Sequence, residues 1–135
     1  MRKRTKIAAA GATLMAAAAL VAAPASAATP PSTSPSVSHK YYSSGADIPA
    51  CASGYACAIV AYGSGYYVFN FYTYGTYSLS NWIGQGGLTN AQTGGASVRV
   101  LNSSGTQIDC LPAEPITYEV NWSPAWKIRL TSSGC

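Results

Sequence analysis

The sequence has little charge and one histidine, and both shortages restrict the chemistry it can perform. Charged residues make up 9% of its 135 residues, and His39 is the single histidine. General acid–base catalysis needs a positioned histidine or a pair of carboxylates in a pocket. His39 lies among serines and prolines, and the four carboxylates are scattered, at Asp47, Asp109, Glu114 and Glu119. We therefore expect no enzyme, no cofactor and no metal site, and for Asp109 and Glu114 we favour a surface loop over a glycosidase pair.

The basic residues are unevenly distributed. Four of the eight stand at the start of the chain: Arg2, Lys3, Arg4 and Lys6. They precede a short Ala-rich apolar run that ends in "PASA" at Ala27. A basic start, an apolar run and a small-residue cleavage pattern predict a secretory signal peptide over residues 1–27, rather than a membrane anchor. We expect the mature chain to be secreted and not inserted in a membrane.

Without the signal peptide the chain is neutral. Four basic residues remain against the four carboxylates: Lys40, Arg99, Lys127 and Arg129. Nucleic-acid binding needs a basic stripe, so we expect no nucleic-acid partner. Residues 28–47 are rich in Ser, Pro and Thr, a composition typical of a flexible leader. Residues 48–135 are expected to form one domain.

No window of this domain has convincing helical spacing. Six runs are instead rich in β-branched and aromatic residues, and Gly or Pro clusters separate them. These runs are 55–62, 66–74, 96–102, 106–111, 116–120 and 125–131. One helical turn, capped by Ser80 or Asn81, can fit within 79–87. The pattern predicts an all-β domain, a small antiparallel β-sandwich or Greek-key arrangement.

Four cysteines lie in the domain, and an even number in a secreted chain favours disulfides over metal ligands. Three pairings are possible. We favour Cys51–Cys57 with Cys110–Cys135, because Gly54 at the centre of "CASGYAC" lets the chain turn back. Disulfides of this kind would stabilise a domain of such small size.

Short motifs give the chain a resemblance to a known family. They comprise "CASGYAC", a Tyr-Gly hairpin, "SLSNW" and "GGASVRV", through Cys51, Gly54, Cys57, Tyr62, Gly63, Gly65, Trp82, Ser97 and Arg99. In order and spacing they resemble the secreted actinobacterial peptidase inhibitors typified by Streptomyces metalloproteinase inhibitor. The resemblance implies a βγ-crystallin-like fold of two packed antiparallel sheets with Greek-key topology. Some relatives bind calcium through paired Asn or Asp, but only Asn90 and Ser97 stand near such positions, so we expect no calcium site.

The resemblance also implies a function, inhibition of secreted peptidases and of metalloproteinases in particular. The candidate inhibitory loop is "TQIDCLPAEP", with Asp109, Cys110, Leu111 and Pro112 at its centre. A disulfide at Cys110 and the prolines would stiffen it. By resemblance the reactive bond lies between Cys110 and Leu111. The competing interpretation is a strand that ends in a disulfide and a Pro-containing loop.

A second function class follows from the fifteen aromatic residues. Strand alternation through "YYVFNFYTY" predicts Tyr67, Phe69 and Phe71 in the core. A predicted contact surface contains Tyr66, Tyr72, Tyr74, Trp122 and Trp126. Such a surface would make the chain a non-inhibitory module that contacts cell-wall polysaccharide or protein.

Overall fold

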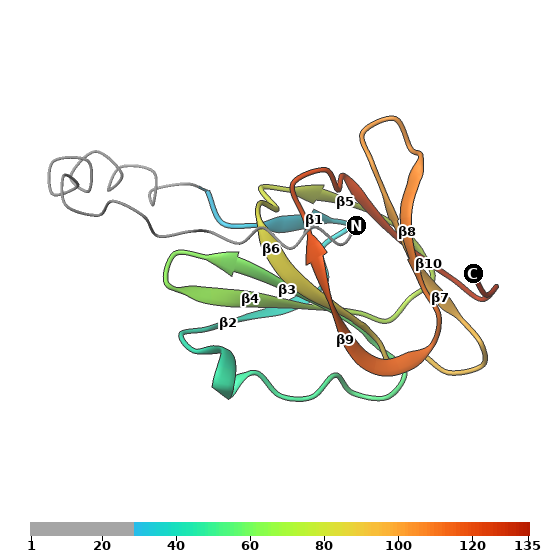
Figure 1. Ribbon diagram of the computed structural model, residues 1–135, viewed down its shortest axis with the longest axis horizontal. Helices are drawn as coiled ribbons and strands as arrows, with labels where there is room; N and C mark the ends of the chain where they lie inside the picture. Colours follow the sequence, from blue (N-terminus) through green and yellow to red (C-terminus); the bar gives the residue numbers. More distant parts are fainter. Residues whose placement is uncertain (1–28) are drawn as a thin grey trace, which may run out of the picture.

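The computed structural model describes residues 29–135, which form two antiparallel sheets of five strands each. Figure 1 shows the two sheets as two layers that pack face to face. No helix in this part of the chain is long and apolar enough to cross a membrane. The predicted signal peptide lies outside the described residues.

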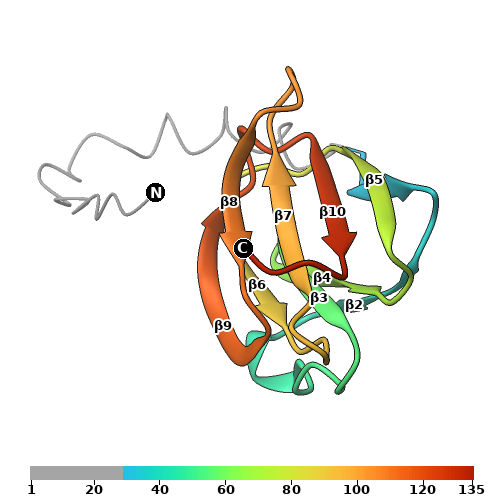
Figure 2. The ribbon, with the colours of Figure 1, turned by 90° about the vertical axis from the view of Figure 1, so that its right-hand side faces the viewer.

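We call the two layers sheet A and sheet B. Sheet A contains, in spatial order, β1 (Ser32–Ser34), β5 (Gly75–Ser80), β10 (Lys127–Thr131), β7 (Ser97–Leu101) and β8 (Gln107–Leu111). Sheet B contains β2 (Ser38–Tyr42), β4 (Gly65–Phe71), β3 (Ala56–Tyr62), β6 (Gln85–Asn90) and β9 (Glu114–Asn121). Figure 2 shows sheet A from its outer side, in front of sheet B. The prediction of a small all-β, disulfide-stabilised antiparallel sandwich is confirmed.

The chain exchanges strands between the two sheets. One four-strand unit, β3 to β6, supplies three neighbouring strands to sheet B and places β5 in sheet A. The next unit, β7 to β10, supplies three neighbouring strands to sheet A and places β9 in sheet B. Each sheet therefore depends on both halves of the chain, so neither half can close a core alone.

The favoured disulfide pairing is confirmed. Cys51 is bonded to Cys57, with Cα atoms 5.8 Å apart, and Cys110 is bonded to Cys135, with Cα atoms 5.9 Å apart. Both distances are typical of disulfides in proteins. One bridge ties the segment before β3 to sheet B, and the other ties the end of the chain to β8.

The six predicted strand runs all contain strands, but the leader prediction is wrong where the structure shows pairing. Residues 32–34 pair with β5, and residues 38–42 pair with β4 along their whole length. Between these strands Val37 packs against the core. The Ser/Thr-rich composition offers little apolar area, yet backbone hydrogen bonds to two open sheet edges order the segment.

The prediction of a helical turn within 79–87 is also wrong. Within residues 29–135 the helical element is instead the 3₁₀ turn η3 (Gly45–Asp47), which Ser44 caps. Residues 81–84 instead connect β5 to β6, and Asn81 has a positive φ of 61°, a conformation that Asn tolerates. In "GTYSLS" Tyr77 and Leu79 are buried and the other four residues are exposed, which is the pattern of a strand.

The core follows the predicted alternation on β4. Phe69 and Phe71 are fully buried, and Tyr67 packs against them at the margin. At the centre Trp82 and Trp122 meet edge to face, with ring centroids 4.9 Å apart. The indole of Trp122 donates a hydrogen bond to the backbone oxygen of Ile59 at 2.8 Å. Gly86 lies beneath this ring, and a side chain there would collide with both partners of that bond.

Gly86→Ala should therefore destabilise the domain by about 3 kcal/mol, because the added methyl meets backbone and a buried indole that cannot move aside. The free energy of unfolding in urea, with both disulfides intact, measures the effect. Gly45→Ala is the matched control, since its methyl would meet Tyr66 at an ordinary 3.5 Å. Equal stability of the two variants would contradict the packing described here.

Candidate functional site: a tyrosine groove

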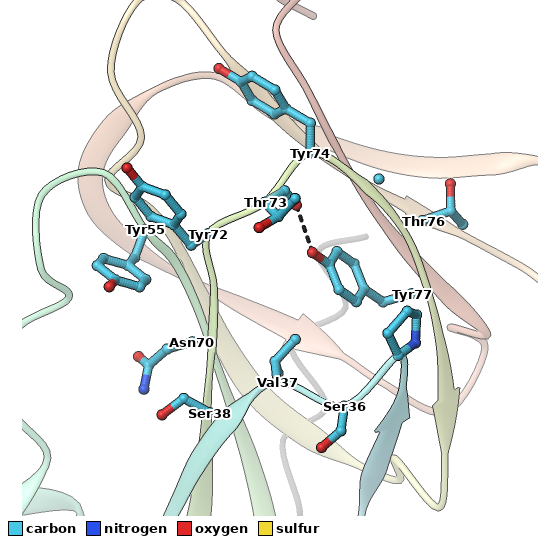
Figure 3. A pocket seen from close by; sticks show the side chains of 12 residues that line it. Ser36, Val37, Ser38, Tyr55, Asn70, Tyr72, Thr73, Tyr74, Thr76 and Tyr77 are labelled. Atoms are coloured by element: carbon cyan, nitrogen blue, oxygen red, sulfur yellow. Dashed lines mark hydrogen bonds between the residues drawn. The ribbon is translucent and has the colours of Figure 1, made fainter.

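A groove of about 550 Å³ lies where the chain passes from sheet B to sheet A. Its walls come from the link between β1 and β2, from Tyr55 before β3, from the end of β4, and from the corner that leads into β5 together with the start of β5. Figure 3 shows tyrosine rings around its rim and Val37 at one end. Groove residues far apart in the sequence are adjacent only because β2 pairs with β4 and β1 with β5.

The corner itself presents two tyrosines to solvent. Phe71 is the last core residue of β4, and β5 begins at Gly75, so residues 72–74 must bridge the two sheets. Tyr72 is 65% exposed and Tyr74 is 55% exposed. Large apolar rings exposed together on a rigid corner are typical of a contact site rather than of a core.

Tyr77 forms the buried side of the groove and holds the corner. Its hydroxyl donates a 2.6 Å hydrogen bond to the backbone oxygen of Thr73, which Figure 3 marks by a dashed line. Its ring packs edge to face on Phe71 at 4.9 Å. Burial raises the pKa of the Tyr77 phenol above its ordinary value of 10.0. The group is therefore a neutral donor that fixes the backbone between Tyr72 and Tyr74.

Tyr55 extends the aromatic rim from the other side. Its ring lies 5.0 Å from that of Tyr72, with an angle of 49° between the planes. Two backbone hydrogen bonds hold its segment on the link after β6: Gly54 donates to Ala91 at 2.7 Å, and Ala91 donates to Tyr55 at 2.9 Å. The Cys51–Cys57 bridge closes the same segment. The rim is thus fixed by covalent and hydrogen bonds.

A second hollow, of about 290 Å³, lies on the far side of Tyr72 and Tyr74. Gly54, Gln92 and Thr93 line it together with the same two tyrosines. Each exposed ring can therefore contact a ligand on either side. A chain that crossed the corner would meet both hollows in succession.

The groove also holds polar groups, and apart from the tyrosine phenols they are uncharged hydroxyls and an amide. Ser36, Ser38, Thr73 and Thr76 contribute hydroxyls, and Asn70 contributes an amide. No Asp, Glu, His, Lys or Arg is among its lining residues. Aromatic rings with a few hydroxyls and an amide suit a neutral ligand rich in both C–H faces and hydroxyl groups.

The predicted aromatic surface is only partly assembled. Tyr72 and Tyr74 stand together at the groove, whereas Tyr66 is half-buried on the outer face of sheet B, beside Gly45. Trp126 is 57% exposed but borders a different hollow, with Ile83. The prediction that Trp122 is a contact residue is wrong, because its ring is fully buried at the centre of the core.

Most of the segment predicted to be the inhibitory loop is a strand in the structure. Asp109, Cys110 and Leu111 belong to β8, where they pair with β7. Leu111 lies opposite Val98 on the inner face and is only 5% exposed. Its side chain cannot enter a peptidase cleft while the domain is folded. Pro112 is exposed, at the start of the short link to β9.

Asn90 and Ser97, the two residues nearest a calcium pattern, are both fully buried. The amide of Asn90 donates to the backbone oxygens of Ala96 and Leu111, and its oxygen accepts from Gln92. Ser97 donates to the backbone oxygen of Ser133 at 2.7 Å. Their side-chain oxygens are therefore already engaged in hydrogen bonds within the protein. Among the described residues, no cluster of three His, Cys, Asp or Glu could hold a metal ion.

Tyr55 and Tyr77 are site residues that sequence reasoning misses. Nothing in the local sequence separates them from the other eight tyrosines. The alternation of "GTYSLS" places Tyr77 inside, but only the fold brings its hydroxyl to Thr73. The contact of Tyr55 with Tyr72 depends in the same way on the chain path before β3.

Tyr77→Phe should cost about 1 kcal/mol of unfolding free energy near neutral pH, because it removes the hydrogen bond to Thr73. The folded state holds the phenol proton more tightly than the unfolded chain, so this contribution is complete below pH about 10 and declines as the pH rises further. Urea unfolding over this pH range should therefore show the gap between wild type and variant narrowing. Tyr74→Phe is the control, and a gap independent of pH would contradict the assignment.

Known proteins offer no template for the groove. No family model matches the chain, and neither a curated protein nor a solved structure matches it. The resemblance to the peptidase inhibitors therefore stays with the sequence motifs that carry it. What the chain binds depends on the chemistry of its own exposed side chains.

Proposed function

We propose that the protein is a secreted, non-catalytic binding module that holds a neutral polysaccharide chain across the tyrosine groove. The observation that most directly supports this proposal is the fixed corner, which exposes Tyr72 and Tyr74 between two hollows. Tyrosine offers a large amphipathic surface and loses little conformational entropy on binding. Its flat ring fits the C–H face of a sugar, and its hydroxyl fits the wet edge.

The polar lining supports a sugar over an apolar ligand. Asn70, Ser38 and Thr76 place hydrogen-bonding groups beside the rings, and sugars carry hydroxyls on every side. The absence of charge from the lining favours a neutral sugar ring at this point. A rigid site also needs less ordering when it binds, which improves affinity for a given contact area.

The proposed location is the cell exterior. Two disulfides are typical of proteins from oxidising compartments, and the first 27 residues have the pattern of a secretory signal. The exchange of β5 and β9 between the sheets supports the Greek-key, βγ-crystallin-like topology that the resemblance implies. Fold alone does not identify the ligand, because one fold carries many functions.

The double variant Tyr72→Ala, Tyr74→Ala should lose about 2 kcal/mol of binding free energy, since both stacking surfaces are removed from an exposed corner. Retention of the oxidised protein on insoluble chitin, cellulose and purified cell wall measures the effect. The matched control is Trp126→Ala, which removes an exposed ring from a different hollow. The proposal fails if wild type is retained by none of these materials, or if Trp126→Ala is as impaired as the double variant.

A second candidate, peptidase inhibition, keeps one supporting observation. Ile83 is 65% exposed at the link between β5 and β6, and both neighbours of Ile83 are fixed. Trp82 is buried and donates its indole N–H to Ser32 at 2.9 Å. Gly84 donates to Ser123 and accepts from the backbone N–H of Trp122. An apolar side chain on such a rigid link could contact a metalloproteinase, and Leu111 would not contribute to that contact.

If inhibition occurs through this link, Ile83→Ala should weaken it by about 2 kcal/mol, because a well-fitted aliphatic anchor carries that much of an interface. An inhibition panel of secreted metallo- and serine peptidases provides the measurement. Ile116→Ala is the matched control, since Ile116 is 50% exposed on β9, away from this link. No inhibition by wild type, or equal losses in both variants, would remove this candidate.

A further inference from the structure

The charges of the described chain are separated between its faces. Three of the four basic residues that follow the predicted signal peptide lie on the outer face of sheet A: Arg99 on β7, and Lys127 and Arg129 on β10. The neutral total of residues 28–135 conceals this concentration.

The side-chain carboxylates lie elsewhere. Asp47 belongs to η3, and Glu114 and Glu119 belong to β9 in sheet B. Asp109 is on β8 but lies opposite Val100, whose side chain is buried in the core, so it points to the inner side at the sheet edge. The terminal carboxylate belongs to Cys135, whose disulfide partner Cys110 lies directly opposite Arg99 on the outer face. The strand positions that face outward on sheet A therefore present cations without carboxylate side chains.

Two of the cations are placed against each other. Arg99 and Arg129 are direct register partners across β7 and β10. Like charges directly opposite in a sheet are destabilising, and a single Glu at either position would relieve the repulsion. Within residues 29–135 neither arginine forms an ion pair. A local rule broken in this way is typical of a functional site.

The hydrogen bonds orient these groups without neutralising them. Arg99 donates to three uncharged acceptors: Ser97 Oγ at 3.3 Å, Gln107 Oε1 at 3.0 Å and the Gly134 carbonyl at 2.7 Å. Arg129 donates from Nε to Thr76 Oγ1 at 3.0 Å. A guanidinium has five N–H donors, so two remain on Arg99 and four on Arg129. These remaining donors can bind an external anion.

Hydroxyl groups continue the surface toward the sheet edge. Ser78 lies between Lys127 on one side and Ser34 on the other, and Ser32 pairs with Ser80. Figure 2 shows this side of sheet A, with the chain end crossing between β10 and β8. Hydroxyls and arginines together are the donor set that suits phosphate oxygens, which accept paired N–H bonds from a guanidinium.

We propose that the outer face of sheet A binds a polyol-phosphate chain, a phosphodiester-linked polymer without bases. Charge complementarity selects a polyanion, and the arginine pair favours phosphate groups. Single-stranded nucleic acid needs aromatic rings on which bases stack, but the outward strand positions of this face carry none. Trp126 precedes β10 and hydrogen-bonds Leu79 and Leu101 through its backbone. The site borders the groove at Thr76, which lines the groove and accepts a hydrogen bond from Arg129.

The test uses the double variant Lys127→Gln, Arg129→Gln of the oxidised, secreted protein and a lipid-free poly(glycerol phosphate) preparation as the probe. Its dissociation constant should rise about tenfold, because two exposed cations lose their phosphate partners. Raising the salt concentration should weaken binding of wild type more than of the variant. Arg99 is left intact, since it also holds Gly134 and Gln107.

The matched control is Lys40→Gln, on the outer side of sheet B, where Lys40 lies over the ring of Tyr42. It removes a cation and should leave poly(glycerol phosphate) binding unchanged. Three results would overturn the proposal: no binding by wild type, an equal loss in Lys40→Gln, or equally tight binding of single-stranded DNA. Retention on neutral polysaccharide should not change in the single variant Lys127→Gln, which leaves the hydrogen bond between Arg129 and Thr76 intact, and Tyr72→Ala, Tyr74→Ala should not affect phosphate binding. The two proposals can therefore fail independently.

Discussion

The packing of Trp122 on Gly86 is the contact on which the rest of the structure depends. Trp122 follows β9 in sheet B and leads the chain to β10 in sheet A, so its ring lies at a crossing between layers. Trp82 makes the reverse crossing after β5, and the two rings meet edge to face. The indole of Trp82 then binds Ser32 and fixes β1. Because Gly86 has no side chain, Trp122 can pack against it. Trp122 then contacts Trp82, and Trp82 binds Ser32, so these contacts fix both connections between the sheets and β1.

Among the described residues, the buried polar side-chain atoms all have hydrogen-bond partners within the protein. Binding to other molecules therefore depends on the corners and outer faces. Asn90, the fully buried amide, makes its hydrogen bonds within the protein, and Leu111 fills the core beside it. The residues with unused contact area are those where the chain changes sheets, such as Tyr72, Tyr74 and Ile83. Buried Tyr77 holds Thr73 between the two tyrosines, and buried Trp82 precedes Ile83, so exposure is combined with rigidity. That combination is what a binding surface requires.

The sequence predicts the parts that depend on local pattern and misses those that depend on partners. Alternation places Phe69 and Phe71 correctly, because strand periodicity needs no knowledge of the rest of the fold. It fails for residues 32–42, where order comes from pairing with β4 and β5 rather than from buried apolar area. Leu111 and Trp122 look available in sequence because nothing local reveals what covers them. The groove combines residues 35–38, Tyr55 and residues from 70 to 77, so no local motif predicts it.

The sequence gives the total charge but not how the fold distributes it. That distribution also affects how the two proposed surfaces would act together. A neutral total predicts weak electrostatics, yet the cations on sheet A are separated from Glu119 and Asp47 on the sheet B side. A polyanion would attract the first face and repel the second, so the domain would dock in one orientation. Thr76 joins the attracted face to the tyrosine groove. Docking through phosphate would therefore bring the groove beside the same polymer layer, where even weak sugar contacts gain from the raised local concentration.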